Sequence, residues 1–103
     1  MSRREFLLAA EPHLIADVTL YATNAGGREE PVYLGWGCPC LPSRAAPGWD
    51  GWPLIGEDPL VPGETRRVGF HFMSGDEAAN VMRKAGRFYL WEGRLVGEAE
   101  VID

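Results

Sequence analysis

Apolar and polar residues alternate along the chain after Pro12. The apolar positions that would share one face of an extended segment are Leu14, Ala16, Val18, Leu20 and Ala22. Polar residues such as Asp17 and Thr19 fall on the opposite face. A period of two is typical of a half-buried strand, because successive side chains of a strand point to opposite sides of the sheet. The pattern therefore predicts a first strand over 14–22.

A second alternation follows a polar loop at 24–31. It predicts a strand over 32–40, with these apolar positions on one face: Val32, Leu34, Trp36, Cys38 and Cys40. The next segment, 42–51, is rich in Pro and Gly, so we expect a long loop there, followed by a short strand over 52–55.

The C-terminal half contains a turn, an alternating run and a hairpin. Pro62-Gly63-Glu64 predicts a turn into a strand whose apolar positions are Val68, Phe70 and Phe72. Two apolar runs then meet at Glu92-Gly93, where glycine supplies the positive φ that a tight turn requires. The segment 86–97 therefore predicts a β-hairpin.

One helix interrupts the strands. Ser74 and Glu77 match the spacing of a capping box, and Gly86 is a natural helix terminator. Between them, apolar residues recur at helical spacing: Ala78, Val81, Met82 and Ala85. We therefore expect a helix over about 75–85, which is too short to be stable alone and must pack on the strands.

About six strands and one short helix in 103 residues predict a single all-β domain, either a small closed barrel or a sandwich. The side chains that we expect to point inward are Leu14, Val18, Leu20, Leu34, Val68, Phe70, Phe72, Phe88, Leu90, Leu95 and Val101.

The chain carries 10 basic and 15 acidic residues, a net charge of −5, which argues against generic nucleic-acid binding through a basic face. The first eight residues look in part like a twin-arginine export signal. The apolar run Phe6–Ala10 is too short for one, however, and Glu11 ends it. No apolar run is long enough to span a membrane. We therefore expect a cytoplasmic protein.

Motifs for nucleotide binding and catalysis are missing from the sequence. It contains neither Gly-Lys-Ser nor Gly-Lys-Thr, so no P-loop can hold nucleotide phosphates. Acidic residues of the predicted loops lie in no catalytic pattern and are best explained as solvated charges: Asp50, Glu57, Asp58 and Glu64. We expect neither an enzyme nor a bound cofactor.

Cys38 and Cys40 are the residues most suggestive of chemistry. At i and i+2 of a strand two thiols point the same way, with α-carbons about 6.5 Å apart, so they could share a metal or act in redox chemistry. A structural zinc site needs four ligands, however, and only His13 and His71 could add nitrogen donors. We favour the alternative of two small buried thiols and predict no metal site.

Trp49 and Trp52 flank Asp50-Gly51 in the predicted long loop. Aromatic side chains in such loops often anchor protein interfaces, because they bury a large area at a small entropic cost. The alternative is a loop that folds back and plugs one end of a barrel with its own tryptophans. Exposed side chains would favour the interface, and buried ones the plug.

Short Gly- and Pro-containing motifs follow one another in a definite order. They are Pro12-His13, Gly26-Gly27-Arg28, Pro31, Gly35-Trp36, Pro62-Gly63-Glu64, Arg87-Phe88, Glu92-Gly93-Arg94 and Val96-Gly97. In this order they resemble the third, C-terminal β-barrel domain of translation elongation factor Tu. The resemblance implies a small antiparallel Greek-key β-barrel over 12–103, as a free-standing single-domain protein. It also implies a lead-in segment over 1–11, in which 7–10 matches the strand that enters the domain. The helix at 75–85 is a departure from the family.

The same barrel of the elongation factor engages tRNA and protein partners, which implies partner-binding roles for Arg28 and Arg94. Glu29 and Glu30 stand where the family has a histidine and a threonine or serine, and two carboxylates there would repel a phosphate.

We therefore expect a non-catalytic binding module with a protein partner. The expected surfaces are the 42–53 segment with Trp49 and Trp52, and the 26–30 loop. The alternative is a translation-associated protein that binds RNA or tRNA, for which Arg28, Arg94 and either Arg66 or Arg67 must converge on one face. A second alternative is a metal or thiol site at the two cysteines.

Overall fold

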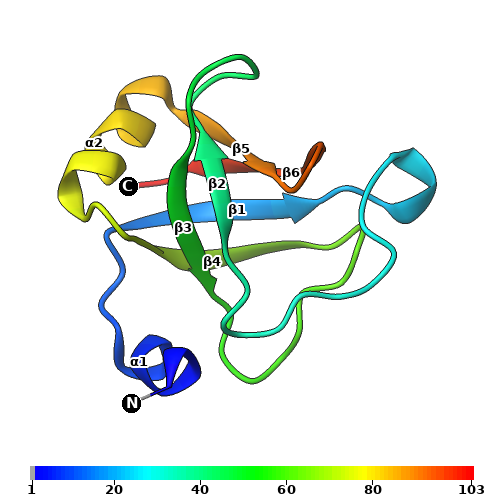
Figure 1. Ribbon diagram of the computed structural model, residues 1–103, viewed down its shortest axis with the longest axis horizontal. Helices are drawn as coiled ribbons and strands as arrows, with labels where there is room; N and C mark the ends of the chain where they lie inside the picture. The colour runs from blue at the N-terminus through cyan, green and yellow to red at the C-terminus, as the bar shows by residue number, and fades with distance from the viewer. Residues whose placement is uncertain (1) are drawn as a thin grey trace.

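The computed structural model describes residues 2–103, which form a closed barrel of six antiparallel strands (Figure 1). The strands are β1 (Leu14–Leu20), β2 (Cys38–Leu41), β3 (Trp49–Leu54), β4 (Thr65–Phe72), β5 (Arg87–Trp91) and β6 (Leu95–Val101). The helices are α1 (Arg3–Ala9), the 3-10 turn η1 (Thr23–Ala25) and α2 (Asp76–Ala85).

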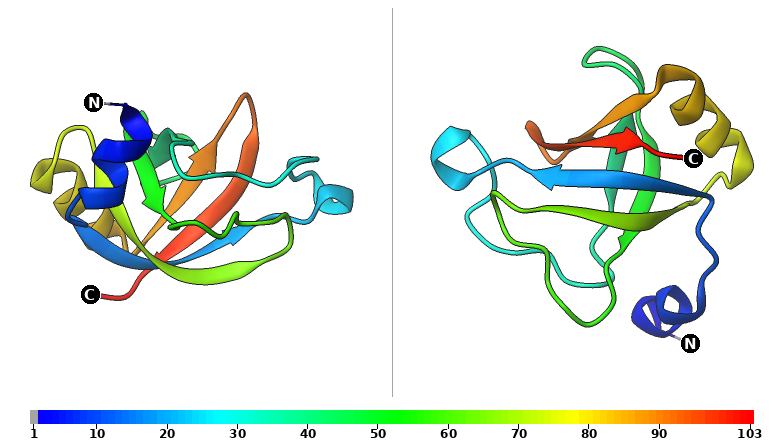
Figure 2. Two further views of the ribbon diagram at one scale, coloured as in Figure 1. Left: turned by 90° about the horizontal axis from the view of Figure 1, so that it is seen from below. Right: turned by 180° about the vertical axis from the view of Figure 1, so that it is seen from behind.

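The strand order around the barrel is β1-β4-β3-β2-β5-β6, and β6 closes the circle by pairing with β1. Because β1 lies beside β4 while β2, β3 and β4 follow one another, the first four strands have the Greek-key arrangement. The predicted small antiparallel barrel is thus confirmed. Figures 1 and 2 show α1 at one end of the molecule and the η1 loop at the opposite end.

The core is built from the alternate side chains that the strands turn inward. Three phenylalanines form its centre, with ring centroids 5.1–5.9 Å apart: Phe70, Phe72 and Phe88. Of the predicted inward residues, all are buried except Leu95 and Val101, which are half-buried. The register between β5 and β6 shifts at Leu90/Trp91, so Leu95 pairs with the outward-facing Trp91 and Val96 is buried instead.

The predicted strand over 32–40 is wrong in its first half. Val32 and Leu34 are buried, but they make only isolated bridges, and regular pairing begins at Cys38. Gly35, between Leu34 and Cys38, has φ +109°, which breaks the extended chain. In this segment the alternating apolar residues are buried, but they do not form a continuous strand. The predicted long loop is also shorter than expected, because β3 begins at Trp49.

Helix α2 is confirmed, but its predicted capping box is wrong. Gly75 is the N-cap with φ +64°, and no side chain caps the helix. The capping box lies instead at α1, where the Ser2 hydroxyl accepts from the Glu5 N–H and the Glu5 carboxylate accepts from the Ser2 N–H. The predicted lead-in strand at 7–10 is therefore wrong, since this local signal makes the segment helical.

Candidate functional site

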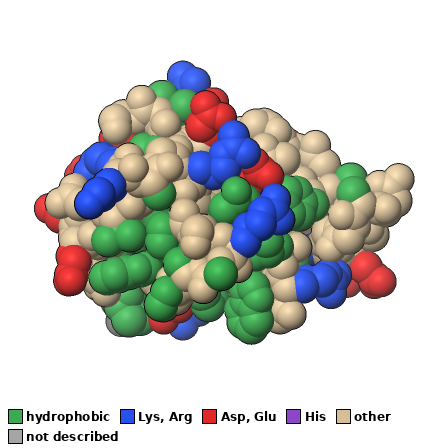
Figure 3. Space-filling model, turned by 90° about the horizontal axis from the view of Figure 1, so that it is seen from above, with side chains coloured by type: hydrophobic (Ala, Val, Ile, Leu, Met, Phe, Trp, Pro, Cys, Tyr) green, Lys and Arg blue, Asp and Glu red, His purple; other side chains and the backbone are tan. Residues whose placement is uncertain are grey.

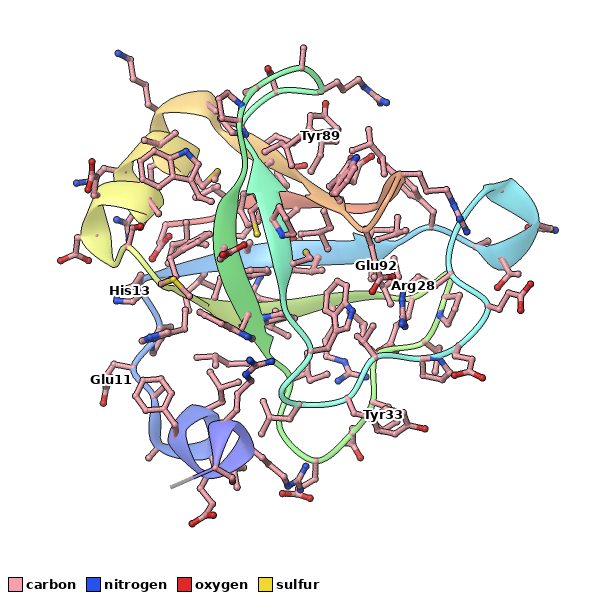
Figure 4. The ribbon with its side chains drawn as sticks, in the orientation of Figure 1. Glu11, His13, Arg28, Tyr33, Tyr89 and Glu92 are labelled. Atoms are coloured by element: carbon pink, nitrogen blue, oxygen red, sulfur yellow. The ribbon has the colours of Figure 1, made fainter. Side chains whose placement is uncertain are left out.

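Arg28 lies at the end of the molecule that carries the η1 loop. Its Nε donates to Glu92 Oε1 at 2.7 Å, and its Nη1 donates to the carbonyls of Glu30 and Pro31 at 2.8 and 3.1 Å. Trp36 donates its indole N–H to the second oxygen of Glu92 at 2.9 Å, and the Arg28 guanidinium lies 5.5 Å from the Trp36 ring centroid. Figure 4 shows Arg28 and Glu92 pointing toward one another.

Arg94 lies at the same end. It donates from Nε and Nη2 to the carbonyls of Gly26 and Gly27 at 3.0 and 3.1 Å. The structure thus brings both predicted arginines to one hollow of about 240 Å³, which Glu29 and Glu30 also line. Both guanidiniums are already bound internally, and they cross-link the 26–31 loop to the β5–β6 turn.

The electrostatics of Glu92 follow from this network. Burial alone would raise its pKa. Hydrogen bonds from Trp36 and Arg28, with the positive charges of Arg28 and Arg94, outweigh burial and lower the pKa below its ordinary value. The carboxylate is therefore held in its charged form by groups of the chain itself.

Trp49 and Trp52 lie on strand β3, not in a loop. They are three residues apart, so they face opposite sides of the strand. Trp49 shares the inward parity of the buried Gly51 and packs partly against the core. Trp52 faces outward beside His71 of β4, and it too packs partly against the core. Both side chains are half-buried. Their exposure therefore fits neither the prediction of two exposed interface residues nor that of two buried residues that plug the barrel.

Trp52 borders two hollows. The first, about 330 Å³, lies between α1 and β3 and is lined by Ser2, Arg3, Phe6, Leu7 and Trp52. The second, about 230 Å³, is lined by Arg3, Gly37, Cys38, Pro39, Asp50, Trp52 and Met73. Because Arg3 and Trp52 line both, the two hollows flank one indole ring, and we call them together the Trp52 groove.

Two residues lie close to the Trp52 indole, Gly37 and Arg3. A β-carbon on Gly37 would lie 2.4 Å from Cδ1 and Nε1 of the ring, so only glycine lets the ring lie this close to the backbone. The Arg3 guanidinium lies 6.0 Å from the ring centroid, at the outer limit of a cation–π contact. Sequence reasoning did not assign Arg3, Phe6 or Met73 to a site. The Ser-x-x-Glu spacing at Ser2 was the signal that could have placed α1.

A histidine pair lies beneath α1. The His13 and His71 rings are 4.3 Å apart, and Phe6 of α1 meets His71 edge-on at 5.3 Å. His13 Nδ1 accepts from the Phe72 N–H at 2.9 Å, so that nitrogen carries no proton. Burial lowers the pKa of His13, the His71 ring lowers it further, and Asp76 opposes both. Figure 4 shows His13 where β1 begins.

Both cysteines are buried, in agreement with the alternative that the sequence favoured. Cys40 is fully buried in the core, and its Sγ lies 3.5 Å from the Cys38 carbonyl oxygen. Burial raises the pKa of the Cys40 thiol well above its ordinary value, so the reactive thiolate is disfavoured. Within residues 2–103, no three His, Cys, Asp or Glu side chains gather in a way that could hold a metal ion.

A further aromatic surface lies beside the β2–β3 loop. The Arg44 guanidinium lies 4.8 Å from the Tyr89 ring centroid, and Trp91 on the same strand is 43% exposed. Figure 3 shows this side of the molecule, where apolar side chains mix with Lys and Arg. Trp91 lines neither hollow of the Trp52 groove nor the hollow of Arg28 and Arg94, so it serves as a comparison for Trp52.

Among the helices of residues 2–103, none has the length and apolar character needed to cross a bilayer. No protein-family model matches the chain, and no curated protein matches it in sequence.

Proposed function

We propose that this chain is a non-catalytic binding module that engages a protein partner through the Trp52 groove. The observation that carries the proposal is the position of Trp52, a half-buried outward tryptophan between two hollows. Tryptophan, arginine and methionine are enriched at protein interfaces, and tryptophan is frequent among the residues that dominate binding energy.

The surroundings of Trp52 fit an interface. Two apolar side chains that line the groove, one on α1 and one in the β4–α2 connection, are exposed: Phe6 at 47% and Met73 at 67%. An apolar surface of this kind costs solvation free energy unless another molecule covers it. The Trp52 ring is half-buried and lies against the backbone at Gly37, so binding would order it at little additional entropic cost.

The resemblance to the C-terminal barrel of elongation factor Tu is part of this proposal. The observed closed barrel with its Greek-key order is compatible with that domain. In the elongation factor this barrel supplies contacts rather than chemistry, and we propose the same for residues 12–103. On this proposal the protein works in the cytoplasm and binds neither nucleotide nor cofactor.

Binding of RNA or tRNA through Arg28 and Arg94 is less well supported. Both guanidiniums donate to carbonyls or to Glu92, and two further carboxylates line the same hollow. Of the other arginines that this alternative invoked, Arg66 pairs with Glu64 and Arg67 with Asp17. A phosphate would have to displace these partners, so we treat RNA binding as an outcome of the test.

The test is affinity capture from a lysate of the source cells, with Trp52→Ala beside the wild type and Trp91→Ala as the matched control. Each variant is first shown to be folded by its NMR spectrum, and eluates are analysed for protein and RNA. We expect a protein partner that Trp52→Ala loses and Trp91→Ala keeps. A partner that Trp52→Ala retains, or tRNA that weakens steeply with salt, would contradict the proposal.

A further inference from the structure

We propose that the Trp52 groove receives a partner segment in which an apolar side chain is followed by a single acidic residue. The apolar side chain would enter the hollow between α1 and β3, and the carboxylate would pair with Arg3. This inference rests on the proposed function, and it names the chemistry of the occupant.

The first hollow suits one apolar side chain. Its lining residues are Ser2, Arg3, Phe6, Leu7 and Trp52. Its volume of about 330 Å³ lies at the lower end of the range for ligand sites, which is roughly 300–1,000 Å³. A hollow of that volume, with Phe6, Leu7 and Trp52 in its lining, accommodates a Leu or Phe side chain rather than a large polar cofactor.

Arg3 is the positively charged residue of the groove, and its guanidinium forms no ion pair with the described residues. Within residues 2–103 no carboxylate lies within ion-pair distance of it, and its one hydrogen bond, to the Gly35 carbonyl, is long at 3.5 Å. The next residue differs, since Arg4 pairs with Glu57 at 2.7 Å and lines neither hollow. Arg3 therefore presents free N–H donors beside an aromatic ring, the arrangement that suits a planar carboxylate.

The charges around the groove limit the occupant to one acidic residue. Asp50 lines the second hollow, so a run of acidic residues crossing Trp52 would approach a carboxylate of the same sign. The chain as a whole carries −5 and repels acidic ligands beyond contact distance. The attraction is therefore local to Arg3.

The experiment uses three capped dipeptides and the ¹⁵N-labelled full chain. The peptides are acetyl-Phe-Asp-amide, its neutral analogue acetyl-Phe-Asn-amide, and acetyl-Gly-Asp-amide, which lacks the apolar side chain. The readout is the indole N–H signal of Trp52, assigned from its loss in Trp52→Ala. We expect the Phe-Asp peptide to bind about 3-fold more tightly than the Phe-Asn peptide, as one exposed ion pair provides. The Gly-Asp peptide should bind more weakly than both.

Two variants decide whether Arg3 reads the carboxylate. Arg3→Gln should remove the preference for Asp over Asn, whereas Arg4→Gln, with the same loss of charge on the same helix, should keep it. Equal binding of the two Phe peptides to the wild type, the same preference in Arg3→Gln, or no movement of the Trp52 signal would each overturn the inference. The capture experiment tests the protein-binding role of the groove separately. If a partner depends on Trp52 but the peptides show no preference for Asp, only the proposed apolar–acidic segment is refuted.

Discussion

The two ends of the barrel use arginine and tryptophan in opposite ways. At the η1 end, Arg28 and Trp36 both donate to the one carboxylate of Glu92. At the α1 end, Arg3 and Trp52 lie beside two hollows, and Arg3 has no carboxylate partner within residues 2–103. The same pair of residue types is thus a structural cross-link at one end and an available surface at the other. The partners of a guanidinium, rather than its presence near an aromatic ring, indicate which role it has.

The two ends also differ in how firmly they are attached. The η1 loop is tied to the β5–β6 turn by charged hydrogen bonds from two arginines. Helix α1 buries one residue, Leu7, and adds the exposed Arg4–Glu57 pair, the edge-on contact of Phe6 with His71 and the long hydrogen bond from Arg3. Because α1 forms one wall of the Trp52 groove, the groove depends on the less firmly attached end.

The largest effect is expected at Leu7. Its side chain is only 3% exposed and belongs to the core cluster, so Leu7→Ala should cost about 2 kcal/mol or more of the docking of α1. The barrel strands should keep their structure, because they pair only with one another. Hydrogen exchange should show lost protection in α1 but not in β1–β6. Leu8→Ala, at an exposed position, is the control, and equal loss of protection across the whole chain would contradict the prediction.

The next effect is expected at Glu92. Glu92→Gln keeps the shape but removes the charge that Arg28 and Trp36 share, which should lower stability by about 1 kcal/mol. Glu30→Gln is the matched control, because Glu30 contributes only its backbone carbonyl to Arg28. Urea denaturation of both variants measures the difference. A loss as large in Glu30→Gln would show that net charge, not the hydrogen-bond network, controls the stability of this end.

A smaller effect is expected on acidification through His13. Since the pKa of His13 is lowered by folding, the folded state binds this proton less readily than the unfolded state. Its contribution to stability is therefore complete above the ordinary histidine value of about 6.5, and it is lost as the pH falls through the lowered pKa. His13→Asn can still accept from the Phe72 N–H but does not titrate.

Thermal unfolding between about pH 7.5 and 5 tests this prediction, because the carboxylates with lowered pKa values titrate below that range. Those groups are Asp17, Glu64, Glu92 and Asp103. The wild type should lose stability within this range more steeply than His13→Asn. Parallel curves would contradict the role given to His13.

The smallest effect on stability is expected at Arg3. Because its only hydrogen bond is long and it has no ion pair within residues 2–103, Arg3→Gln should change stability by less than about 0.5 kcal/mol. Urea denaturation measures the change. A larger loss would mean that Arg3 is structural, like Arg28, and would remove the contrast between the two ends.

Much of the fold could be predicted from local signals. Period-two patterns located the inward faces of β1 and β4, and Glu92-Gly93 located the closing hairpin. Two Ser-x-x-Glu segments matched the capping box, and only the one at Ser2 forms it. At the other, Gly75 takes the cap position, so the Ser74 side chain is not placed to accept from the first turn. The sequence pattern does not predict that Gly75, rather than Ser74, takes the N-cap position.

The candidate site was less predictable, because it depends on contacts between distant segments. Once β3 is known to be a strand, the opposite facing of Trp49 and Trp52 follows from their spacing. The spacing does not reveal that α1 packs beside Trp52, because this contact joins residues some fifty positions apart in the chain and depends on the burial of Leu7. Likewise, Arg28 and Arg94 could be named as candidates, but their carbonyl partners appear only in the folded chain.

Site-specific photo-cross-linking in the source cells would show whether the Trp52 groove contacts a protein. The photoreactive residue p-benzoylphenylalanine would replace either Met73, which is 67% exposed at the Trp52 groove, or Glu29, at the hollow of Arg28 and Arg94. We expect a covalent adduct with a protein from position 73 and none from position 29. An adduct from position 29 alone, whether with protein or with RNA, would contradict this expectation.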